Sequence, residues 1–209
     1  MGELEFNNCV VEVTQKRLFA DSDGLIGTDI FADFLIHLNY PGRLLKLALL
    51  PHRNAPAVPT EIGDRYHFDR FDQGVPHETA NLHPIRVLSG KLFLPTVVDE
   101  KFRSHFIIDS GAAESIISTE LGEQATHLAR SGDTVAGVSG RVRDVYRARA
   151  VTLQFASFRQ QNQGMLSLEL KNLSKVIGSE VGGLIGHPTL RHFTLIINYR
   201  DGVVGFVHH

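Results

Sequence analysis

The sequence predicts an all-β protein with a few short helices. Residues 151–156 and 166–170 alternate apolar and polar side chains at period two, which is the pattern of strands with one buried face. Residues 106–108 form a short continuous apolar run, which fits a strand buried on both faces. Turn-forming residues such as 39–42 and 99–101 separate these segments. Together the observations favour many short strands joined by tight turns.

Composition limits the classes of function. The chain has 209 residues, 43% hydrophobic and 21% charged, which suits one large globular domain or one and a half small ones. The net charge is −2 and no run of Lys or Arg occurs, so we expect no nucleic-acid partner. No apolar run is long enough to span a bilayer and residues 1–6 lack a signal-peptide pattern, so we expect no membrane association. Cytoplasm and periplasm both stay open as compartments.

Metal and disulfide chemistry are not expected either. Cys9 is the only cysteine, so no disulfide can form within the chain. The 11 histidines are scattered and show no metal-ligand spacing. We therefore expect neither a metal nor another cofactor.

The first 50 residues predict short strands around one short helix. In order, we expect one or two strands in 1–20, a helix over 28–33 capped by Thr28 or Asp29, and strands at 34–38 and 44–50.

Residues 51–84 differ in character from what precedes them. Five of the eight prolines of the chain lie here, and regular structure is hard to sustain at that density. We expect a Pro-rich linker, with the aromatic residues of 66–71 packed against a domain.

Strands resume at about residue 85 and continue to the end of the chain. Ser118 can cap a helix in which Leu121, Ala125 and Leu128 share one face, and Pro188 suits the first turn of another short helix. We expect strands at 92–98, 102–108, 151–156, 166–170, 193–197 and 203–207, and a hairpin whose tip is 137–140.

An acidic turn follows the buried strand that ends at Ile108. The turn reads Asp109-Ser110-Gly111-Ala112, and its glycine allows a sharp change of direction. It would hold a carboxylate at a fixed point at the end of a buried strand, which is a place suited to chemistry.

The chain also contains an internal repeat. Residues 24–27 read Gly-Leu-Ile-Gly, and so do residues 183–186. At the same spacing, without a gap, a Phe and an Asn-Tyr pair recur at 34 and 39–40 and at 193 and 198–199. Only the second copy has an acidic turn upstream, so the first copy reads as the back half of a domain whose front half is missing. We expect its apolar edges to be buried against the second domain or against another chain.

In this order, the motifs of residues 85–209 resemble those of the retropepsin-like aspartic proteases, in the form found in bacterial proteins with tandem copies of that domain. Residues 107–112 look like the catalytic apolar-Asp-Ser/Thr-Gly-Ala motif. Residues 137–140 are similar to the tip of the flap hairpin, and residues 184–186 to the apolar-apolar-Gly element beneath the catalytic turn. Residues 1–50 match only the second half of the same domain.

The resemblance implies a closed β barrel with a flap over a peptide-binding cleft, and an incomplete first copy of the same fold in 1–50. It implies an aspartic endopeptidase acting on peptides or proteins. Carried over by position, Asp109 is the catalytic carboxylate, Ser110 braces it and Gly111 allows close backbone approach. Substrate would be bound by Ala112, Gly137, Val138, Ser139 and Gly140, and the site supported from below by Leu184, Ile185 and Gly186.

One carboxylate per chain leaves the activity open, because this chemistry needs two carboxyl groups that share a proton. The second can come from Asp109 of another chain in a homodimer, or from a missing domain in an intramolecular pseudo-dimer. The alternative is a non-catalytic module that binds peptides or partner strands by edge pairing.

Overall fold

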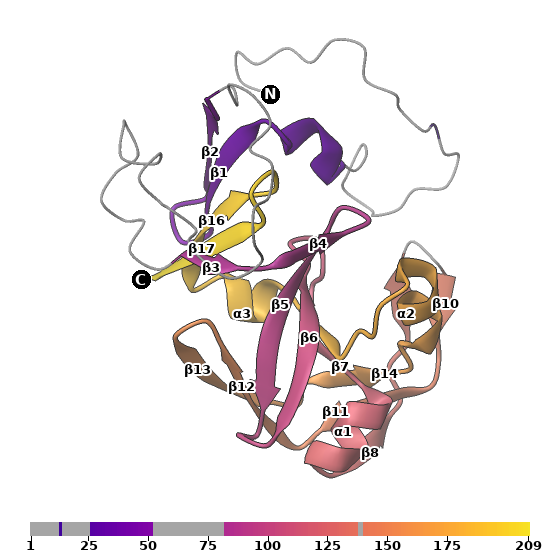
Figure 1. Cartoon of the computed structure of the whole chain (residues 1–209). Coiled ribbons are helices and arrows are strands. Elements are labelled where there is room, and N and C mark those ends of the chain that lie inside the picture. Colours follow the sequence, from indigo (N-terminus) through magenta and orange to yellow (C-terminus); the bar gives the residue numbers. More distant parts are fainter. Residues whose placement is uncertain (1–12, 14–25, 52–81, 138–139) are drawn as a thin grey trace, which may run out of the picture.

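The computed structural model describes residues 13, 26–51, 82–137 and 140–209. The strands expected in 1–20, most of the expected linker and the tip residues Val138 and Ser139 lie outside the described residues. The described part is mostly β, with short helices, as the sequence predicts. Its strands form a large curved sheet, a five-stranded sheet and a two-stranded hairpin (Figure 1).

The large sheet forms the body of the molecule. Its strands run in the order β13-β12-β5-β6-β15-β7-β14-β11-β8. In addition, β4 pairs with the first residues of β5. The bounds are β4 Arg86–Leu88, β5 Lys91–Val98, β6 Phe102–Ile108, β7 Ile116–Ser118, β8 Leu128–Ser131, β11 Val145–Ala148, β12 Ala150–Phe155, β13 Phe158–Gln163, β14 Leu166–Leu168 and β15 Gly183–Ile185.

A crossing of strands at the centre of this sheet positions the acidic turn. β6 and β7 are consecutive in the chain, yet β15 lies between them. β15 runs parallel to β6, with Ile185 opposite Ile108, and antiparallel to β7. The chain that links β6 to β7 must therefore pass over the end of β15, and residues 109–115 form that link.

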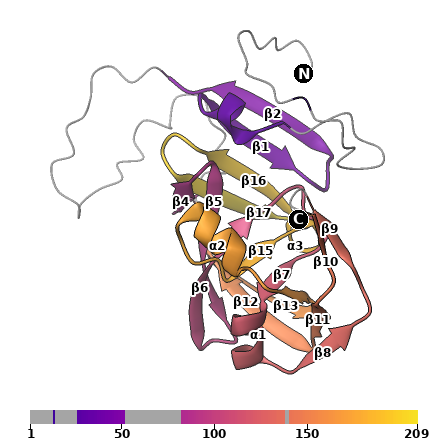
Figure 2. The ribbon, with the colours of Figure 1, turned by 90° about the vertical axis from the view of Figure 1, so that its right-hand side faces the viewer.

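The five-stranded sheet joins the two ends of the chain. Its order is β2-β1-β16-β17-β3, and all neighbours are antiparallel. The bounds are β1 Phe34–Asn39, β2 Leu44–Leu49, β3 Leu82–Pro84, β16 Phe193–Asn198 and β17 Val203–His208. In Figure 2, β1 and β2 lie on the side of this sheet that faces away from the curved sheet.

Helices are short and few among the described residues. They are the 3-10 helix η1 (Thr28–Phe31), α1 (Thr119–Ala125), α2 (Lys171–Ile177) and α3 (His187–Leu190). None of them is long and apolar enough to cross a membrane.

The largest apolar cluster fills the space between the two sheets. Buried side chains of β5, β6, β12 and β15 meet those of β16 and β17 there, and Phe155, Phe193 and Phe206 contact one another edge-on or tilted. Ile36 of β1 joins this cluster. The small sheet therefore packs on the body through the same apolar surface that the body uses for its own core.

The expected elements recur with small changes of boundary, and one expectation is wrong. The helix capped by Ser118 ends at Ala125 because Thr126 is already extended, with φ −154° and ψ 179°. Leu128 therefore lies in β8 and does not share a helix face with Leu121. Strand β3 begins at Leu82, within the segment expected to be linker.

Candidate active site

Asp109 directly follows β6 and lies against the end of β15. Its backbone N–H donates to the carbonyl oxygen of Ile185 at 3.0 Å, and its own carbonyl accepts from the N–H of Ala112 at 3.2 Å. The first bond continues the ladder between β6 and β15, and the second closes a tight turn. The side chain is half-buried. Asp109 is thus fixed at the strand crossing, next to the 184–186 element.

The carboxylate of Asp109 is oriented from within the turn. Its Oδ1 accepts a hydrogen bond from the backbone N–H of Gly111 at 3.0 Å. A Cβ at position 111 would lie 3.4 Å from that oxygen, so glycine leaves this approach open. Ser110 is exposed, and no residue in the described part of the chain hydrogen-bonds its hydroxyl group.

A second set of bonds ties the far end of the turn to the start of α3. The N–H of His187 donates to the carbonyl of Ala112 at 2.9 Å. The N–H of Gly186 donates to Ser115 Oγ at 3.0 Å, and that hydroxyl bonds Thr189 Oγ1 at 3.1 Å. Ser115 and Thr189 are both buried. The acidic turn is therefore held at both ends by the segment from Ile185 to Thr189.

Gly186 is required at this junction for reasons of space. A Cβ there would lie 2.3 Å from the carbonyl oxygen of Glu114 and 2.8 Å from that of Ala112. The backbone φ of Gly186 is −101°, which any residue adopts, so the restriction comes from the close approach of the acidic turn alone.

Sequence reasoning named Gly186 but missed Ser115 and Thr189. Both are polar residues next to apolar ones, Ile116 and Leu190, and both enter the core. A buried polar side chain needs a partner. The only signal in the sequence was this polarity beside apolar neighbours, and it does not say which residue the partner is.

The structure contains strands on both sides of the hairpin tip expected at residues 137–140. β9 (Val135–Gly137) pairs antiparallel with β10 (Gly140–Val142), and Gly137 lies opposite Gly140. Val138 and Ser139, which the sequence places in the tip of the hairpin, are outside the described residues.

Tyr40 brings a side chain from the N-terminal segment toward this site. Its ring contacts His187 of α3 edge-on, with 5.9 Å between ring centroids. Its Oη is buried and has no hydrogen-bond partner among the described residues. Burial most of all, and then the charges of Asp109 and Tyr199, raise the pKa of Tyr40 to about 12. The sequence placed Tyr40 in a turn and in the internal repeat, but did not indicate that it lies near Asp109.

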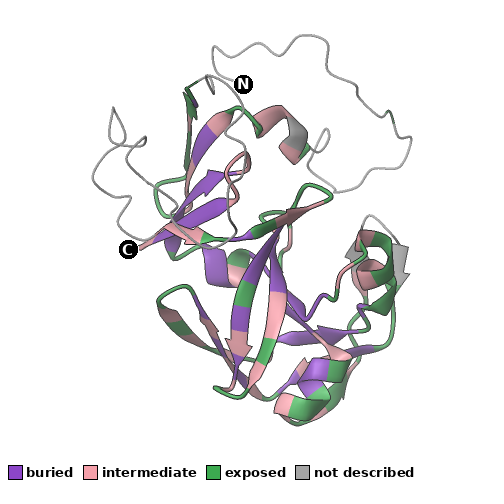
Figure 3. Ribbon diagram, viewed as in Figure 1, coloured by how far each residue is buried: buried purple, intermediate pink, exposed green. Residues whose placement is uncertain are grey.

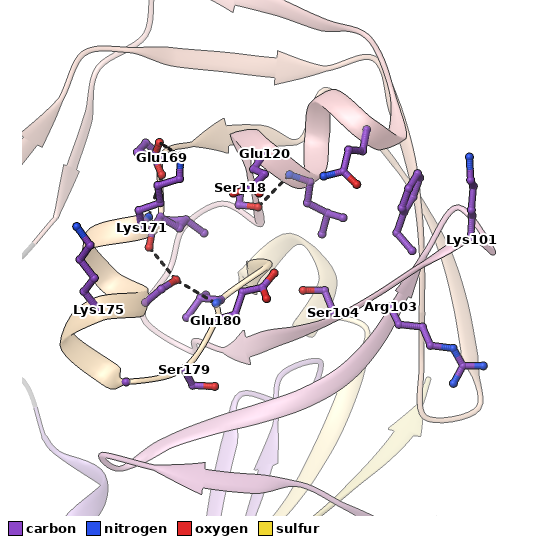
Figure 4. Close-up of a pocket in the computed structure, with 17 residues that line it drawn as sticks. Lys101, Arg103, Ser104, Ser118, Glu120, Glu169, Lys171, Lys175, Ser179 and Glu180 are labelled. Atoms are coloured by element: carbon purple, nitrogen blue, oxygen red, sulfur yellow. Dashed lines mark hydrogen bonds and ion pairs between the residues drawn. The ribbon is translucent and has the colours of Figure 1, made fainter.

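A separate hollow of about 640 Å³ lies between α1 and α2 (Figure 4). It is lined by the beginning of β6, with Arg103 and Ser104, whereas Asp109 follows the end of that strand. Five residues of strand place the two about 17 Å apart. Its lining carries charges of both signs, with Lys101, Lys171 and Lys175 as well as Glu120 and Glu180, and none of its lining residues belongs to the acidic turn.

Among the described residues, no group of three or more His, Cys, Asp or Glu side chains is placed to hold a metal ion. The acidic turn presents one oriented carboxylate.

Comparison with known families and structures gives one sequence match and several remote structural ones. Residues 94–189 match the sequence model of a family described as aspartyl protease. No curated protein matches the chain.

Three solved structures are similar to part of the chain. A retropepsin-like aspartic protease from Rickettsia conorii is 17% identical, with a TM-score of 0.38 over 59% of this chain and 98% of that one. The retroviral protease-like domain of Ddi1 from Leishmania major is 16% identical, with a TM-score of 0.32 over 59% and 95%. The EIAV protease in complex with an inhibitor is 16% identical, with a TM-score of 0.32 over 46% and 96%.

Proposed function

Because residues 94–189 match the aspartyl proteases and resemble their retropepsin-like members, we propose that the chain is an aspartic endopeptidase in which Asp109 activates a water molecule. The observation that carries this proposal is the hydrogen bond of 3.0 Å from the Asp109 N–H to the Ile185 carbonyl. It holds the carboxylate of the matched motif at the crossing of β6 and β15, where an enzyme can keep a reacting group in place.

The reaction needs two carboxyl groups that share one proton. The ionised group takes a proton from water as the water oxygen attacks the carbonyl carbon of the peptide bond. The protonated group gives its proton to the carbonyl oxygen. The carboxyl group that took the water proton then gives it to the amide nitrogen, the C–N bond breaks, and the other carboxylate takes a hydroxyl proton from the tetrahedral intermediate, so that the pair again shares one proton. Two carboxyl groups a few ångströms apart favour this state, because both cannot easily be ionised at once.

Asp109 supplies one of these groups, and a second Asp must approach it from outside residues 82–209. In this proposal the second Asp comes from another chain or from a further lobe. Residues 137–140 would close over the bound peptide, Ala112 would contact its backbone, and Ser110 would brace the pair. The β9–β10 hairpin and the exposed hydroxyl of Ser110 are compatible with these roles.

The alternative is a peptide-binding module without catalysis. The observation that favours it is the single carboxylate at the turn, since Asp109 bonds only backbone groups in the described part of the chain. Such a module would keep the flap hairpin and the turn and bind an extended peptide by its backbone.

Cleavage of a fluorogenic peptide mixture tests the proposal when the oligomeric state is recorded in the same samples. Wild type is compared with Asp109→Asn, and with Asp144→Asn as a matched change in an exposed surface ion pair. We expect all cleavage to depend on Asp109, with a loss of about 10³-fold in Asp109→Asn and none in the control. Equal cleavage by Asp109→Asn would exclude Asp109 as the catalyst. The alternative would be favoured by a protein that binds the peptides but cuts none, even when another chain or a further lobe brings a second Asp turn.

A further inference from the structure

Residues 28–49 and 187–208 are built alike. Each element of the first segment has an equivalent in the second: η1 (Thr28–Phe31) corresponds to α3 (His187–Leu190), β1 to β16, and β2 to β17. The same sequence spacing separates the first residues and the last residues of all three pairs. In the five-stranded sheet their order is β2-β1-β16-β17. The equivalent strands β1 and β16 lie next to each other, and the equivalent strands β2 and β17 lie on their outer sides. Equivalent elements thus occupy equivalent places on the two sides of the β1–β16 pair.

The second of these two units is covered by the curved sheet. Ile185, which precedes α3, lies between β6 and β7 and is 0% exposed. β3 pairs with the outer edge of β17, and Val203 and Val204 of β17 are 2% and 0% exposed. The strands of the curved sheet and β3 all precede this unit in the chain.

The first unit has the same order of elements, but no such cover lies over it in the described part of the chain. Ile26, which is equivalent to Ile185, is 60% exposed. Leu44 and Leu45, which are equivalent to Val203 and Val204, are 45% and 39% exposed. Among the described residues β2 is an edge strand of the sheet, whereas the outer side of β17 is paired with β3. Figure 3 shows the contrast, with β16 and β17 largely buried and β2 largely exposed.

We propose that residues 26–49 are a docking surface for the front half of a second lobe, a segment with the pattern of residues 82–181. Its edge strand would pair with Leu44–Lys46 as β3 pairs with Val203–Gly205. Its Asp-Ser/Thr-Gly turn would lie beside Ile26 and Gly27 as Asp109 lies beside Ile185 and Gly186. This rests on the proposed function, because the occupant then supplies the second carboxylate of the pair.

A second copy of this chain does not meet the same requirement. Its own residues 82–118 already pair with β15 and β17 of the same copy. Its β16 is likewise already paired with β1, so two copies cannot join through that strand without unpairing it. The exposed unit therefore fits a front-half segment that is not already paired within its own chain.

The test supplies such a segment. The full chain is extended at its N-terminus by a second copy of residues 82–182, and amide hydrogen exchange is measured for Leu44–Leu49. We expect the amides of Leu44–Lys46 to exchange at least 10-fold more slowly in the extended chain than in the original, and the extended chain to be a monomer. Peptide cleavage is measured in parallel and should require the Asp of both acidic turns.

A variant and a matched control locate the surface. Leu45→Glu in the extended chain should abolish the added protection. Val176→Glu, at an 84% exposed apolar position of α2, should leave it unchanged. The thermal midpoint of the unextended Leu45→Glu chain should equal that of the original, which separates lost docking from lost folding.

The outcomes separate this inference from the proposed function. Added protection without cleavage supports the docking surface and counts against the peptidase. Unchanged exchange at Leu44–Lys46, or protection that Leu45→Glu leaves intact, overturns the docking surface. If the amides of Leu44–Lys46 in the original chain become more protected as the protein concentration rises, a second copy is the occupant. That result also overturns the inference.

Discussion

His37 lies opposite Ile196 at the centre of the β1–β16 ladder, and the two residues occupy the same position in the two repeated units. When equivalent residues of two antiparallel strands face each other, a local two-fold axis passes between them. The N-terminal hairpin therefore meets the C-terminal hairpin as one subunit meets another in a symmetric dimer. This relationship lets the environment of Asp109 serve as a template for the opposite side of the axis.

Gly186→Ala should destabilise the protein by about 2–3 kcal/mol. The added Cβ would lie 2.3 Å from the Glu114 carbonyl oxygen, and the acidic turn would have to move away from β15 to admit it. Gly132→Ala is the control, because nothing lies within 4 Å of a Cβ at that position, and its effect should stay within about 0.5 kcal/mol. Denaturant unfolding measures both, and similar values would mean that the turn adapts freely.

Ser115→Ala and Thr189→Val should each destabilise by about 1–3 kcal/mol, since each leaves a buried hydroxyl or amide without its partner. The double variant should lose less than the two single variants together, because the hydroxyl–hydroxyl bond is lost only once. Unfolding free energies of the four proteins form the thermodynamic cycle. Strict additivity would show that the two hydroxyl groups are not coupled.

The position of Asp109 could be predicted from sequence because the signals around it are local. An apolar run, a turn with glycine and a second apolar run lie within twelve residues, and the β5–β6 hairpin before them is equally local. These features are set by neighbours in the chain. The pairing of β6 with β15 is not local, and the sequence indicated it only through the resemblance of residues 184–186 to the element beneath the catalytic turn.

The bracing of the site could not be predicted in the same way. Ser115 and Thr189 are 74 residues apart, and no local pattern links them. Helix α2 begins after Leu170, which makes no side-chain capping bond, so the usual start signal is missing. The different burial of Leu45 and Val204 depends on which segments lie beside them, although the two residues are similar in chemistry.

Acidification should destabilise the protein partly through His83 of β3. Burial lowers the pKa of His83 below its usual 6.5, and its Nε2 is buried without a partner among the described residues. Folding therefore favours the neutral ring. The contribution is complete above pH 6.5 and is lost as the pH falls through the lowered pKa, because the unfolded chain takes up the proton first.

His83→Gln should flatten the fall of the thermal midpoint between pH 7.5 and 5, whereas His127→Gln, at an exposed position, should not. An unchanged pH profile in His83→Gln would show that other groups carry the acid sensitivity.

Tyr40 should report the charge of Asp109 without any need for catalysis. Burial, then the Asp109 carboxylate, then Tyr199 raise the pKa of Tyr40 to about 12, and burial raises that of Tyr199 to about 12 as well. A raised phenol pKa contributes stability that is complete below pH 10 and is lost as the pH rises toward 12. Tyr40 and Tyr199 should therefore ionise late in an absorbance titration.

The variants for this titration separate charge from burial. Tyr40→Phe should remove one late-ionising group and leave stability at pH 7 unchanged or raise it by about 1 kcal/mol, because a buried hydroxyl without a partner is lost. Asp109→Asn should keep the number of late groups but lower the pKa of one, since the nearby negative charge is gone. Asp144→Asn should change neither. If Asp109→Asn leaves both late pKa values unchanged, the carboxylate and the phenol do not interact, and the N-terminal hairpin does not reach the electrostatic field of the acidic turn.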